Sequence, residues 1–227
     1  VCYPFPGFQM KSNNIHTVID ALSKAAPSWD VPAVTLVAET SRDPFRVLIS
    51  TVLSLRTKDE TTAAASRRLF ALADNPADML RLSEDEIARA IYPVGFYRVK
   101  ARNVLDICRT LTRDYGSRVP DDLDELLKLK GVGRKTANLV LTLGYNKPGI
   151  CVDTHVHRIS NRLGYIKTKN PLDTEMALRK KLPKKYWIDY NSLLVAFGQH
   201  LCKPISPMCT LCPVSEWCDR VGVGKSR

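Results

Sequence analysis

Lys135 is the residue of this sequence that could form a covalent bond to a substrate. It comes two residues after Gly133 in the segment LKGVGRKTAN (129–138), which places it in the first turn of a predicted helix. There the positive end of the helix dipole and partial burial both disfavour the ammonium form. A lysine held as the neutral amine is a nucleophile. A second phosphate contact and a solvated surface charge are the alternative interpretations of this lysine.

The glycine turn before Lys135 predicts a contact with phosphate. Glycine adopts backbone conformations that strain other residues, and it lets a ligand approach the main chain closely. The helix that follows begins near Arg134, and the N–H groups at a helix start bind anions. We therefore expect an anion site at Gly131, Val132, Gly133 and Arg134. The pattern L-x-G-V-G resembles a helix-hairpin-helix motif, which implies that the anion is a DNA phosphate, held without sequence reading. A plain turn between two helices is the alternative.

Asp153 is the candidate carboxylate, in the segment CVDTHVHR (151–158). It precedes a predicted helix over 154–163, so its simplest role is that of N-cap. A carboxylate facing a cleft beside Lys135 would also stabilise a developing sugar cation, or orient and deprotonate the incoming amine. The two roles are compatible. His155 is expected to support the site by hydrogen bonding, whereas His157 is expected to be structural.

The C-terminal cysteines predict a metal centre. Four of the seven cysteines lie within the last 26 residues, at Cys202, Cys209, Cys212 and Cys218. Zinc is one interpretation, although its four-cysteine sites usually have two CxxC pairs and here only Cys209 and Cys212 form one. An odd cysteine count without the features of a signal peptide argues for a reducing compartment. Cys108 and Cys151 are expected to be buried, inert thiols.

Composition points to a polyanionic partner. The 227 residues carry 34 Lys and Arg against 23 Asp and Glu, a formal net charge of +11. Such an excess is typical of proteins that bind nucleic acid, and a solvated basic surface is the alternative. No run of 18 apolar residues is present, so we expect no membrane span. Residues 1–9 are assigned no function, and a start at Met10 would also be plausible.

Helical periodicity dominates the chain that must position these residues. Ile15, Val18, Ile19 and Leu22 lie on one face of a predicted helix, and Asp43 and Pro44 have the types expected at the start of another. The segment 31–39 comes nearest to a strand, although a short helix or an extended arm suits it as well. The fold class is therefore predicted to be all-α. Further helices are expected over 58–73, 75–82, 83–92, 100–116, 122–130, 134–144, 154–164, 171–182 and 190–202.

Three features in one order resemble a known family. GVGRKTAN, then VDTHVHRISNRLG, then the four terminal cysteines are similar to the endonuclease III family of DNA glycosylases, in the helix-hairpin-helix/Gly-Pro-Asp superfamily. The resemblance runs from about residue 14 to residue 218. It implies two helical lobes with a DNA cleft between them. One is a six-helix domain over 37–147 that carries the hairpin, and the other is an iron–sulfur domain made of 1–36 and 148–227.

The resemblance also assigns roles to the candidate residues. It implies that Lys135 forms a Schiff base with the deoxyribose C1′ and that Asp153 assists. The segment NKPGICVD (146–153) would be the Gly/Pro-rich loop before that aspartate. The four terminal cysteines would hold a [4Fe-4S] cluster, with zinc as the alternative metal.

Two further residues are candidates through the resemblance, because a base inside a duplex must be flipped out before it is removed. Arg56, in LSLRTKD (53–59), replaces the glutamine that is usual at this place in the family, so the preferred opposite base could change. Phe96, in VGFYRVKARN (94–103), stands where a wedge residue is expected. A surface charge is the alternative for Arg56, and core packing is the alternative for Phe96.

The resemblance implies a bifunctional DNA glycosylase and AP lyase of base excision repair. Its partner would be duplex DNA that contains damaged bases, such as oxidised pyrimidines, or abasic sites. A monomer is expected, near the nucleoid in a prokaryote or in the nucleus or mitochondria of a eukaryote. Adenine-removing and mismatch-specific relatives are the runner-up, but they commonly lack a lysine at the place of Lys135. The motifs also leave open a non-catalytic hairpin DNA-binding protein and an iron–sulfur redox protein.

Overall fold

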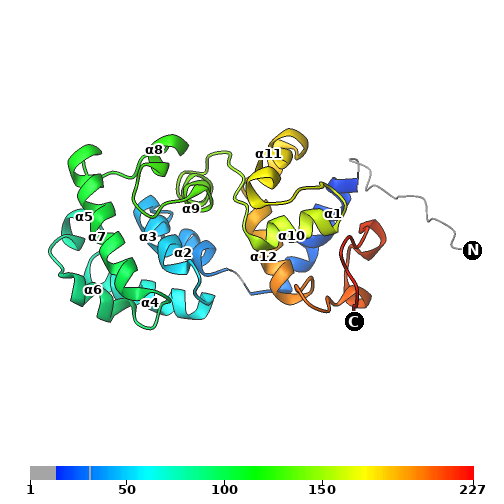
Figure 1. Cartoon of the computed structure of the whole chain (residues 1–227), viewed down its shortest axis with the longest axis horizontal. Helices are drawn as coiled ribbons and strands as arrows, with labels where there is room; N and C mark the ends of the chain where they lie inside the picture. The colour runs from blue at the N-terminus through cyan, green and yellow to red at the C-terminus, as the bar shows by residue number, and fades with distance from the viewer. Residues whose placement is uncertain (1–13, 31) are drawn as a thin grey trace, which may run out of the picture. The chain divides into compact units, whose positions relative to one another are not determined.

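The computed structural model describes residues 14–30 and 32–227. Within these ranges it contains α-helices, short 3-10 turns and one π-helical turn, and no strand, so the all-α prediction is confirmed (Figure 1). The α-helices are α1 Asn14–Ala25, α2 Ala33–Ser41, α3 Pro44–Ser54, α4 Asp59–Leu72, α5 Pro76–Met79, α6 Glu84–Ile91, α7 Tyr97–Asp114, α8 Leu123–Leu127, α9 Arg134–Leu139, α10 Thr154–Arg162, α11 Pro171–Lys181 and α12 Tyr190–His200.

The chain divides into two compact units. The central unit is formed by residues 31–151, and the terminal unit by residues 1–30 together with 152–227. The terminal unit thus brings the first helix together with the last three. The predicted domain boundaries at 37 and 147 stay a prediction.

Helix α3 lies at the centre of the central unit. Its start follows the sequence signal, because the Asp43 side chain accepts a hydrogen bond of 2.9 Å from the Phe45 amide and Pro44 occupies the first helical position. Every residue from Phe45 to Leu53 except Arg46 is buried. Helices α2, α4, α7 and α9 pack around α3. A helix that is buried almost all round belongs in a core.

The segment that was ambiguous in the sequence is helical. α2 begins after Pro32, and it buries Ala33, Val34 and Ala38. Adjacent residues such as Ala33 and Val34 point to opposite faces of a strand, whereas both can lie on the buried side of a helix together with Ala38. α2 ends at Arg42, whose φ of 46° is left-handed and whose amide donates to the Ala38 carbonyl at 2.8 Å.

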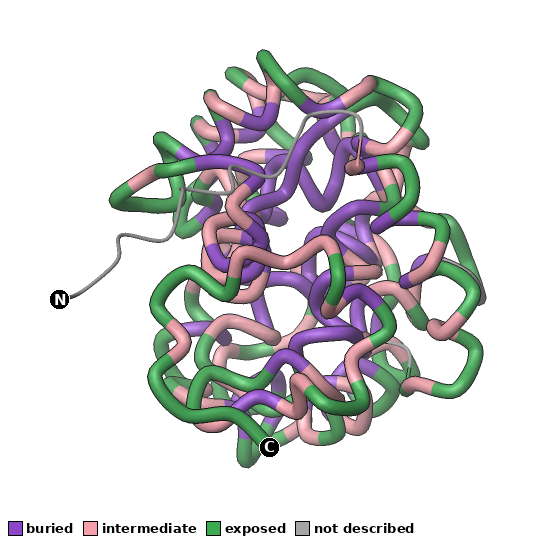
Figure 2. Tube along the Cα trace, turned by 90° about the vertical axis from the view of Figure 1, so that its right-hand side faces the viewer, coloured by how far each residue is buried: buried purple, intermediate pink, exposed green. Residues whose placement is uncertain are grey.

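The terminal unit is built around α10 and α12. The four apolar residues of α1 predicted to share one face are all buried. Trp29, which follows α1, stacks on Phe197 of α12 at a ring separation of 5.7 Å. Figure 2 shows the general pattern of burial, with buried residues along the inner sides of helices and exposed residues mostly in the turns. In the described part of the chain, no helix is long and apolar enough to cross a membrane.

Candidate active site

The glycine turn joins α8 to α9 and contains two glycines of different kinds. Gly131 has a φ of +77°, and a Cβ there would lie 3.0 Å from the Asn103 side chain. The fold itself therefore requires glycine at 131. Gly133 has an ordinary φ of −98°, and a Cβ there would meet no atom within 4 Å. Val132, between them, is buried and anchors the turn to the core.

Lys135 is the second residue of α9, as the sequence predicts. No side chain caps the start of this helix, whose N-cap is Gly133. α9 continues directly into a π-helical turn over Val140–Gly144, so helical backbone runs through the whole predicted segment 134–144. Arg134 and Lys135 are both half-buried. The Lys135 carbonyl accepts a long hydrogen bond of 3.6 Å from the Cys151 thiol.

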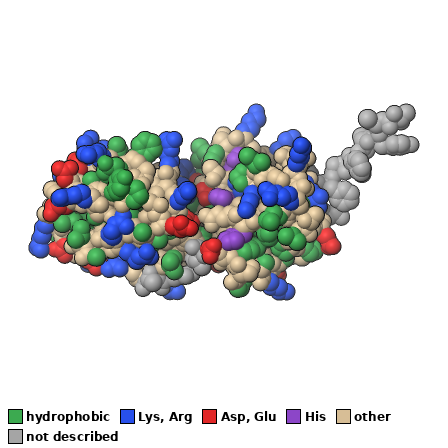
Figure 3. Space-filling model, turned by 90° about the horizontal axis from the view of Figure 1, so that it is seen from below, with side chains coloured by type: hydrophobic (Ala, Val, Ile, Leu, Met, Phe, Trp, Pro, Cys, Tyr) green, Lys and Arg blue, Asp and Glu red, His purple; other side chains and the backbone are tan. Residues whose placement is uncertain are grey.

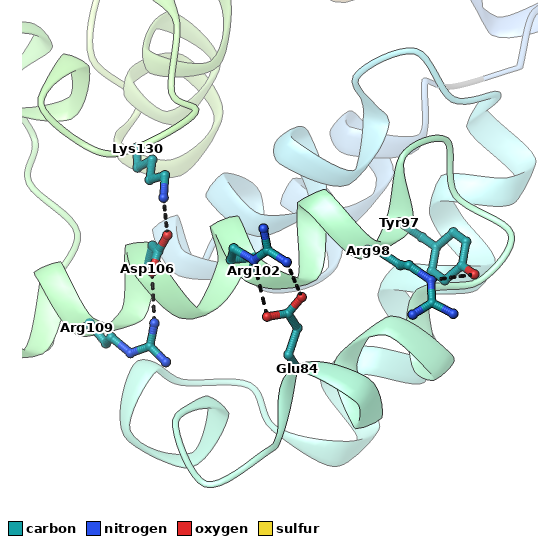
Figure 4. Close-up of polar contacts among 7 residues, drawn as sticks. All are labelled: Glu84, Tyr97, Arg98, Arg102, Asp106, Arg109 and Lys130. Atoms are coloured by element: carbon teal, nitrogen blue, oxygen red, sulfur yellow. Dashed lines mark hydrogen bonds and ion pairs between the residues drawn. The ribbon is translucent and has the colours of Figure 1, made fainter.

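Charged side chains tie the hairpin to α7. Lys130 donates to Asp106 at 2.6 Å, and Arg109 reaches the same carboxylate at 2.8 Å (Figure 4). The bond from Lys130 is the main cause that lowers the pKa of Asp106. One turn earlier on α7, Arg102 binds Glu84 through two nitrogens, at 3.1 and 3.3 Å. These basic residues are therefore engaged by acids of the central unit.

Asp153 is the N-cap of α10, which confirms the simpler of its two predicted roles. Its Oδ1 accepts from the Val156 amide at 2.9 Å, and the residue is only half-buried. His155, in the first turn of the same helix, accepts a hydrogen bond of 3.1 Å at its Nδ1 from the Arg158 guanidinium. His157 bonds to the Thr174 hydroxyl at 2.7 Å and so has the structural role predicted for it.

Arg56 and Phe96 lie against each other in the central unit. The Arg56 guanidinium lies 5.0 Å from the centre of the Phe96 ring. Phe96 is 58% exposed, so its alternative role in core packing is wrong. Both residues have positive φ values, 55° and 59°, which are unusual for residues other than glycine. A cation over an aromatic face is an attractive arrangement, worth about 0.5–1 kcal/mol at an exposed site.

The four terminal cysteines surround one cavity in the terminal unit. Its walls include all four of them and several apolar side chains of α10 and α12. Burial raises the pKa of the Cys218 thiol to about 11 and also raises the pKa of Cys212. In such surroundings a thiol keeps its proton unless a metal takes its place. Among the described residues, no three His, Cys, Asp or Glu side chains form a site for a single metal ion.

A buried arginine bonds to this cavity wall. Arg162, at the end of α10, is 7% exposed, and its guanidinium donates to the Cys202 sulfur at 3.4 Å and to the Lys203 carbonyl at 2.9 Å. Its own carbonyl accepts from the Cys218 thiol at 3.5 Å. A buried positive charge beside four thiols suits a group of net negative charge. The donor set and its surroundings thus fit a thiolate-bound cluster.

Two residues of the central unit have roles that the sequence analysis did not predict. Gly149 lets the loop 146–153 lie directly on the helix after the glycine turn, because a Cβ there would be 3.0 Å from the Asn138 side chain. Lys100 is buried within the central unit, although a lysine is rarely buried. The sequence offered an indication of this burial, since Lys100 shares the helical spacing of Val104, Ile107 and Leu111, which all face the core.

The two cysteines of the central unit are buried, as predicted. Cys108 and Cys151 are fully buried and form no disulfide. Burial raises the pKa of Cys108 to about 12, so this thiol stays protonated near neutral pH.

Lys and Arg side chains are spread over the face that Figure 3 shows, with acidic side chains among them. The positive charge is therefore not confined to one small patch on that face.

Comparisons with known proteins agree on one family. Residues 49–184 match the model of the HhH-GPD superfamily of base excision DNA repair proteins. The chain is 50% identical over 188 residues to endonuclease III of Thermotoga maritima, with 82% of this chain and 88% of that protein covered. It is 40% identical over 228 residues to the chloroplastic endonuclease III homolog 2 of Arabidopsis thaliana. That match covers 93% of this chain but only 59% of the longer plant protein.

A solved structure of an endonuclease III is similar to this chain in fold. It is described as a trapped endonuclease III–DNA covalent intermediate in an estranged-adenine complex. It superposes with a TM-score of 0.82 at 37% sequence identity, over 92% of this chain and 95% of that one. The similarity thus extends from the sequence motifs to the arrangement of nearly the whole chain.

Proposed function

Because the chain belongs to the endonuclease III family, within the HhH-GPD superfamily of base excision DNA repair proteins, we propose that it is a bifunctional DNA glycosylase and AP lyase acting on oxidised pyrimidines in duplex DNA. The observation that carries this proposal is the place of Lys135. It follows a glycine turn open to solvent, on a helix whose start is not capped by any side chain. An anion-binding turn and an amine nucleophile are thereby two residues apart.

Lys135 carries out the covalent chemistry. Its amine attacks C1′ of the flipped nucleotide, and the bond to the damaged base breaks, with the bonding electrons and a proton leaving with the base. Ring opening gives an imine between Lys135 and C1′. Loss of a proton from C2′ then expels the 3′ phosphate by β-elimination, and water hydrolyses the imine and frees the lysine. A monofunctional glycosylase that uses water directly would not form the imine.

Asp153 stabilises the positive charge that develops on the sugar as the base departs. A carboxylate in a site that excludes water is effective in this role. Its position supports the proposal in two ways. The bond from Val156 fixes one carboxylate oxygen at the helix start. Cys151, two residues earlier in the chain, bonds to the carbonyl of Lys135. His155 supports the carboxylate's end of α10 by bonding to Arg158.

The glycine turn and the exposed pair bind the DNA. Gly131, Val132, Gly133 and Arg134 hold a phosphate of the strand that carries the lesion, through backbone amides and one guanidinium. Arg56 and Phe96 fill the gap that the flipped nucleotide leaves. Their mutual contact and exposure support this role, since an aromatic wedge and a polar plug can then enter the stack together.

A [4Fe-4S] cluster is the cofactor proposed for the four terminal cysteines, and the walls of their cavity support it. Cys202, Cys209, Cys212 and Cys218 would hold the cluster, and its iron–thiolate bonds would join the end of α12 to the C-terminal segment. Arg162 places a positive charge beside Cys202. We also infer that the protein is a monomer. It works in the reducing compartment that contains the DNA of its source organism.

Borohydride trapping tests the proposal. Hydride reduces the imine to a stable secondary amine, so the protein becomes covalently attached to the DNA. With a duplex that contains thymine glycol, the protein should give this adduct, and Lys135→Ala should give none while still binding the duplex. Lys130→Ala is the matched control, because Lys130 lies in the same hairpin but is bound to Asp106. That variant should form the adduct.

Two results would contradict the proposal. A full-strength adduct from Lys135→Ala would show that another amine is the nucleophile. Efficient removal of adenine opposite 8-oxoguanine, without removal of thymine glycol, would instead favour an adenine-specific glycosylase. A protein that binds duplex DNA but never nicks an abasic site would be a binding protein and not an enzyme.

A further inference from the structure

Lys100 is a buried lysine whose charge has no acidic partner among the described residues. Its side chain leaves α7 on the face that packs into the core, and the residue is only 6% exposed. Burial lowers its pKa to about 8, which reflects an unfavourable environment for the charge. A leucine or methionine could fill this place without desolvating an ammonium group. A lysine at this position is therefore explained by the groups to which its ammonium donates hydrogen bonds.

The ammonium group holds the end of α3. It donates to the Leu53 carbonyl at 2.8 Å and also to the Leu55 carbonyl and the Thr57 hydroxyl. The last carbonyls of a helix have no partner within the helix, and a positive charge is favourable there. Leu53 and Leu55 lie on either side of the end of α3 at Ser54. Lys100 thereby fixes the backbone that leads into residues 54–57, which we call the Arg56 loop.

A second loop is attached to the same hydroxyl. We call residues 93–96, which precede α7, the Phe96 loop. The Gly95 amide donates to the Thr57 hydroxyl at 3.1 Å. This hydroxyl, which also bonds to Lys100 and to the Leu55 carbonyl, uses its full capacity of one donor and two acceptors. A Cβ on Gly95 would lie 2.7 Å from the Arg56 carbonyl oxygen, so the two loops are in direct contact.

The residues at the tips of both loops are conformationally strained. Arg56 and Phe96 each have left-handed backbone angles, which for residues other than glycine cost roughly 1 kcal/mol or more. Such conformations persist only where the surroundings determine them, and they are frequent at functional sites. Here the surroundings are the bonds of Lys100, Thr57 and Gly95. They hold the Arg56 guanidinium over the exposed Phe96 ring.

We propose that Lys100 is a positioning residue that locks the Arg56 loop to the Phe96 loop, so that Arg56 and Phe96 enter the DNA stack as one preformed wedge. This inference rests on the proposed function, because it assigns a task to the gap-filling residues of that function. A preformed wedge does not lose loop entropy when it binds DNA. The lock therefore assists extrusion of a nucleotide from a duplex. It is not needed for the attack of Lys135 on a sugar that is already exposed.

The test compares Lys100→Met with the wild type on two substrates. One is a duplex with an abasic site and the other is the same abasic strand without its complement. Borohydride trapping should be about tenfold slower for the variant on the duplex and unchanged on the single strand, since about 1.4 kcal/mol of preorganisation is lost only where a gap must be filled. In a second readout, 2-aminopurine stands opposite a tetrahydrofuran abasic analogue. The wild type at saturating concentration should change the fluorescence of this base, and Lys100→Met should not.

Two further variants complete the test. Gly95→Ala pushes the loops apart without altering charge or the interior of α7, so it should show the same duplex-specific loss even if Lys100→Met is poorly folded. Lys180→Met removes an exposed lysine on α11 and should behave like the wild type on both substrates. Equal slowing of Lys100→Met and Gly95→Ala on both substrates, or no slowing on either, would overturn the inference. Absence of any adduct from the wild type would instead refute the proposed function.

Discussion

Among single residues, Arg56 is proposed to fill the gap in the DNA, at a place where the resemblance implies a glutamine. A guanidinium group only donates hydrogen bonds, whereas a glutamine amide both donates and accepts. The pairing edge of guanine offers one acceptor and two donors, and that of cytosine offers two neighbouring acceptors. An arginine that fills the gap should therefore favour cytosine over guanine as the opposite base.

This preference is tested with Arg56→Gln. The ratio of thymine glycol removal opposite cytosine to removal opposite guanine should fall about tenfold in the variant, because one well-placed pair of bonds discriminates by about 1–3 kcal/mol. Single-turnover rates on the two duplexes measure the ratio. A ratio that does not change would mean that Arg56 does not meet the opposite base.

Lys100 also predicts how stability depends on pH. Its pKa is about 8 in the folded protein and 10.5 in an ordinary environment. Between these values the unfolded chain binds more protons, so folding becomes more favourable as the pH rises. The penalty for burying the charge is complete below pH 8 and is relieved by pH 10.5.

The comparison is with Lys100→Met, which lacks this group. The free energy of unfolding of the wild type, relative to the variant, should increase across the window from pH 8 to 10.5. Urea unfolding of both proteins at the two ends of the window measures the difference. A relative stability that decreases with pH would show that the hydrogen bonds of Lys100 outweigh its desolvation.

Among the elements, the hairpin contains one glycine that the fold requires and one that it does not. No atom of the described residues lies within 4 Å of the place of a Cβ on Gly133, and its φ is ordinary. Gly133→Ala should therefore unfold at nearly the wild-type temperature. It should nevertheless bind duplex DNA about tenfold more weakly, because the added methyl group keeps a phosphate from the backbone amides.

Gly131→Ala is the contrasting variant. Its left-handed φ of +77° and its contact with Asn103 should reduce stability by about 1 kcal/mol or more. Thermal unfolding and fluorescence anisotropy with a labelled duplex distinguish the two effects. Normal DNA binding by Gly133→Ala would show that no phosphate approaches this turn.

For the molecule as a whole, we expect the order of the C-terminal segment to depend on a cluster in the cysteine cavity. The segment after α12 contains only short 3-10 turns, and its buried apolar side chains are few. Cys202→Ser should lose iron and visible absorbance. Its residues beyond 202 should become sensitive to protease, because the bonds of the proposed cluster would there take the place of a hydrophobic core.

Cys108→Ala is the matched control for this prediction. It removes a buried thiol from the central core, and it should keep its iron while losing about 1–2 kcal/mol of stability through the small cavity that it leaves. Metal analysis and limited proteolysis of both variants provide the measurements. Zinc in place of iron in the wild-type protein would contradict the cluster and favour a zinc site at the cysteines.

Neighbouring residues along the chain specify the local features of this protein. The caps at Asp43 and Asp153, the helix after the glycine turn and the apolar face of α1 all follow from residues within a few positions of one another. Short-range sterics and hydrogen bonds decide such features, so they can be read from the order of residues. The family motifs are local in the same sense.

Only the tertiary structure decided what the local patterns left open. The bond from Lys100 to the Leu53 carbonyl spans 47 positions, and the bond from Arg162 to the Cys202 sulfur spans 40. The sequence close to Lys100 or Arg162 does not predict the partner of either residue. A buried charge takes whichever acceptors the packing of distant helices brings within reach, because leaving it unpaired would cost several kcal/mol. For the same reason Phe96 could be assigned to the core or the surface only after folding placed its ring beside Arg56.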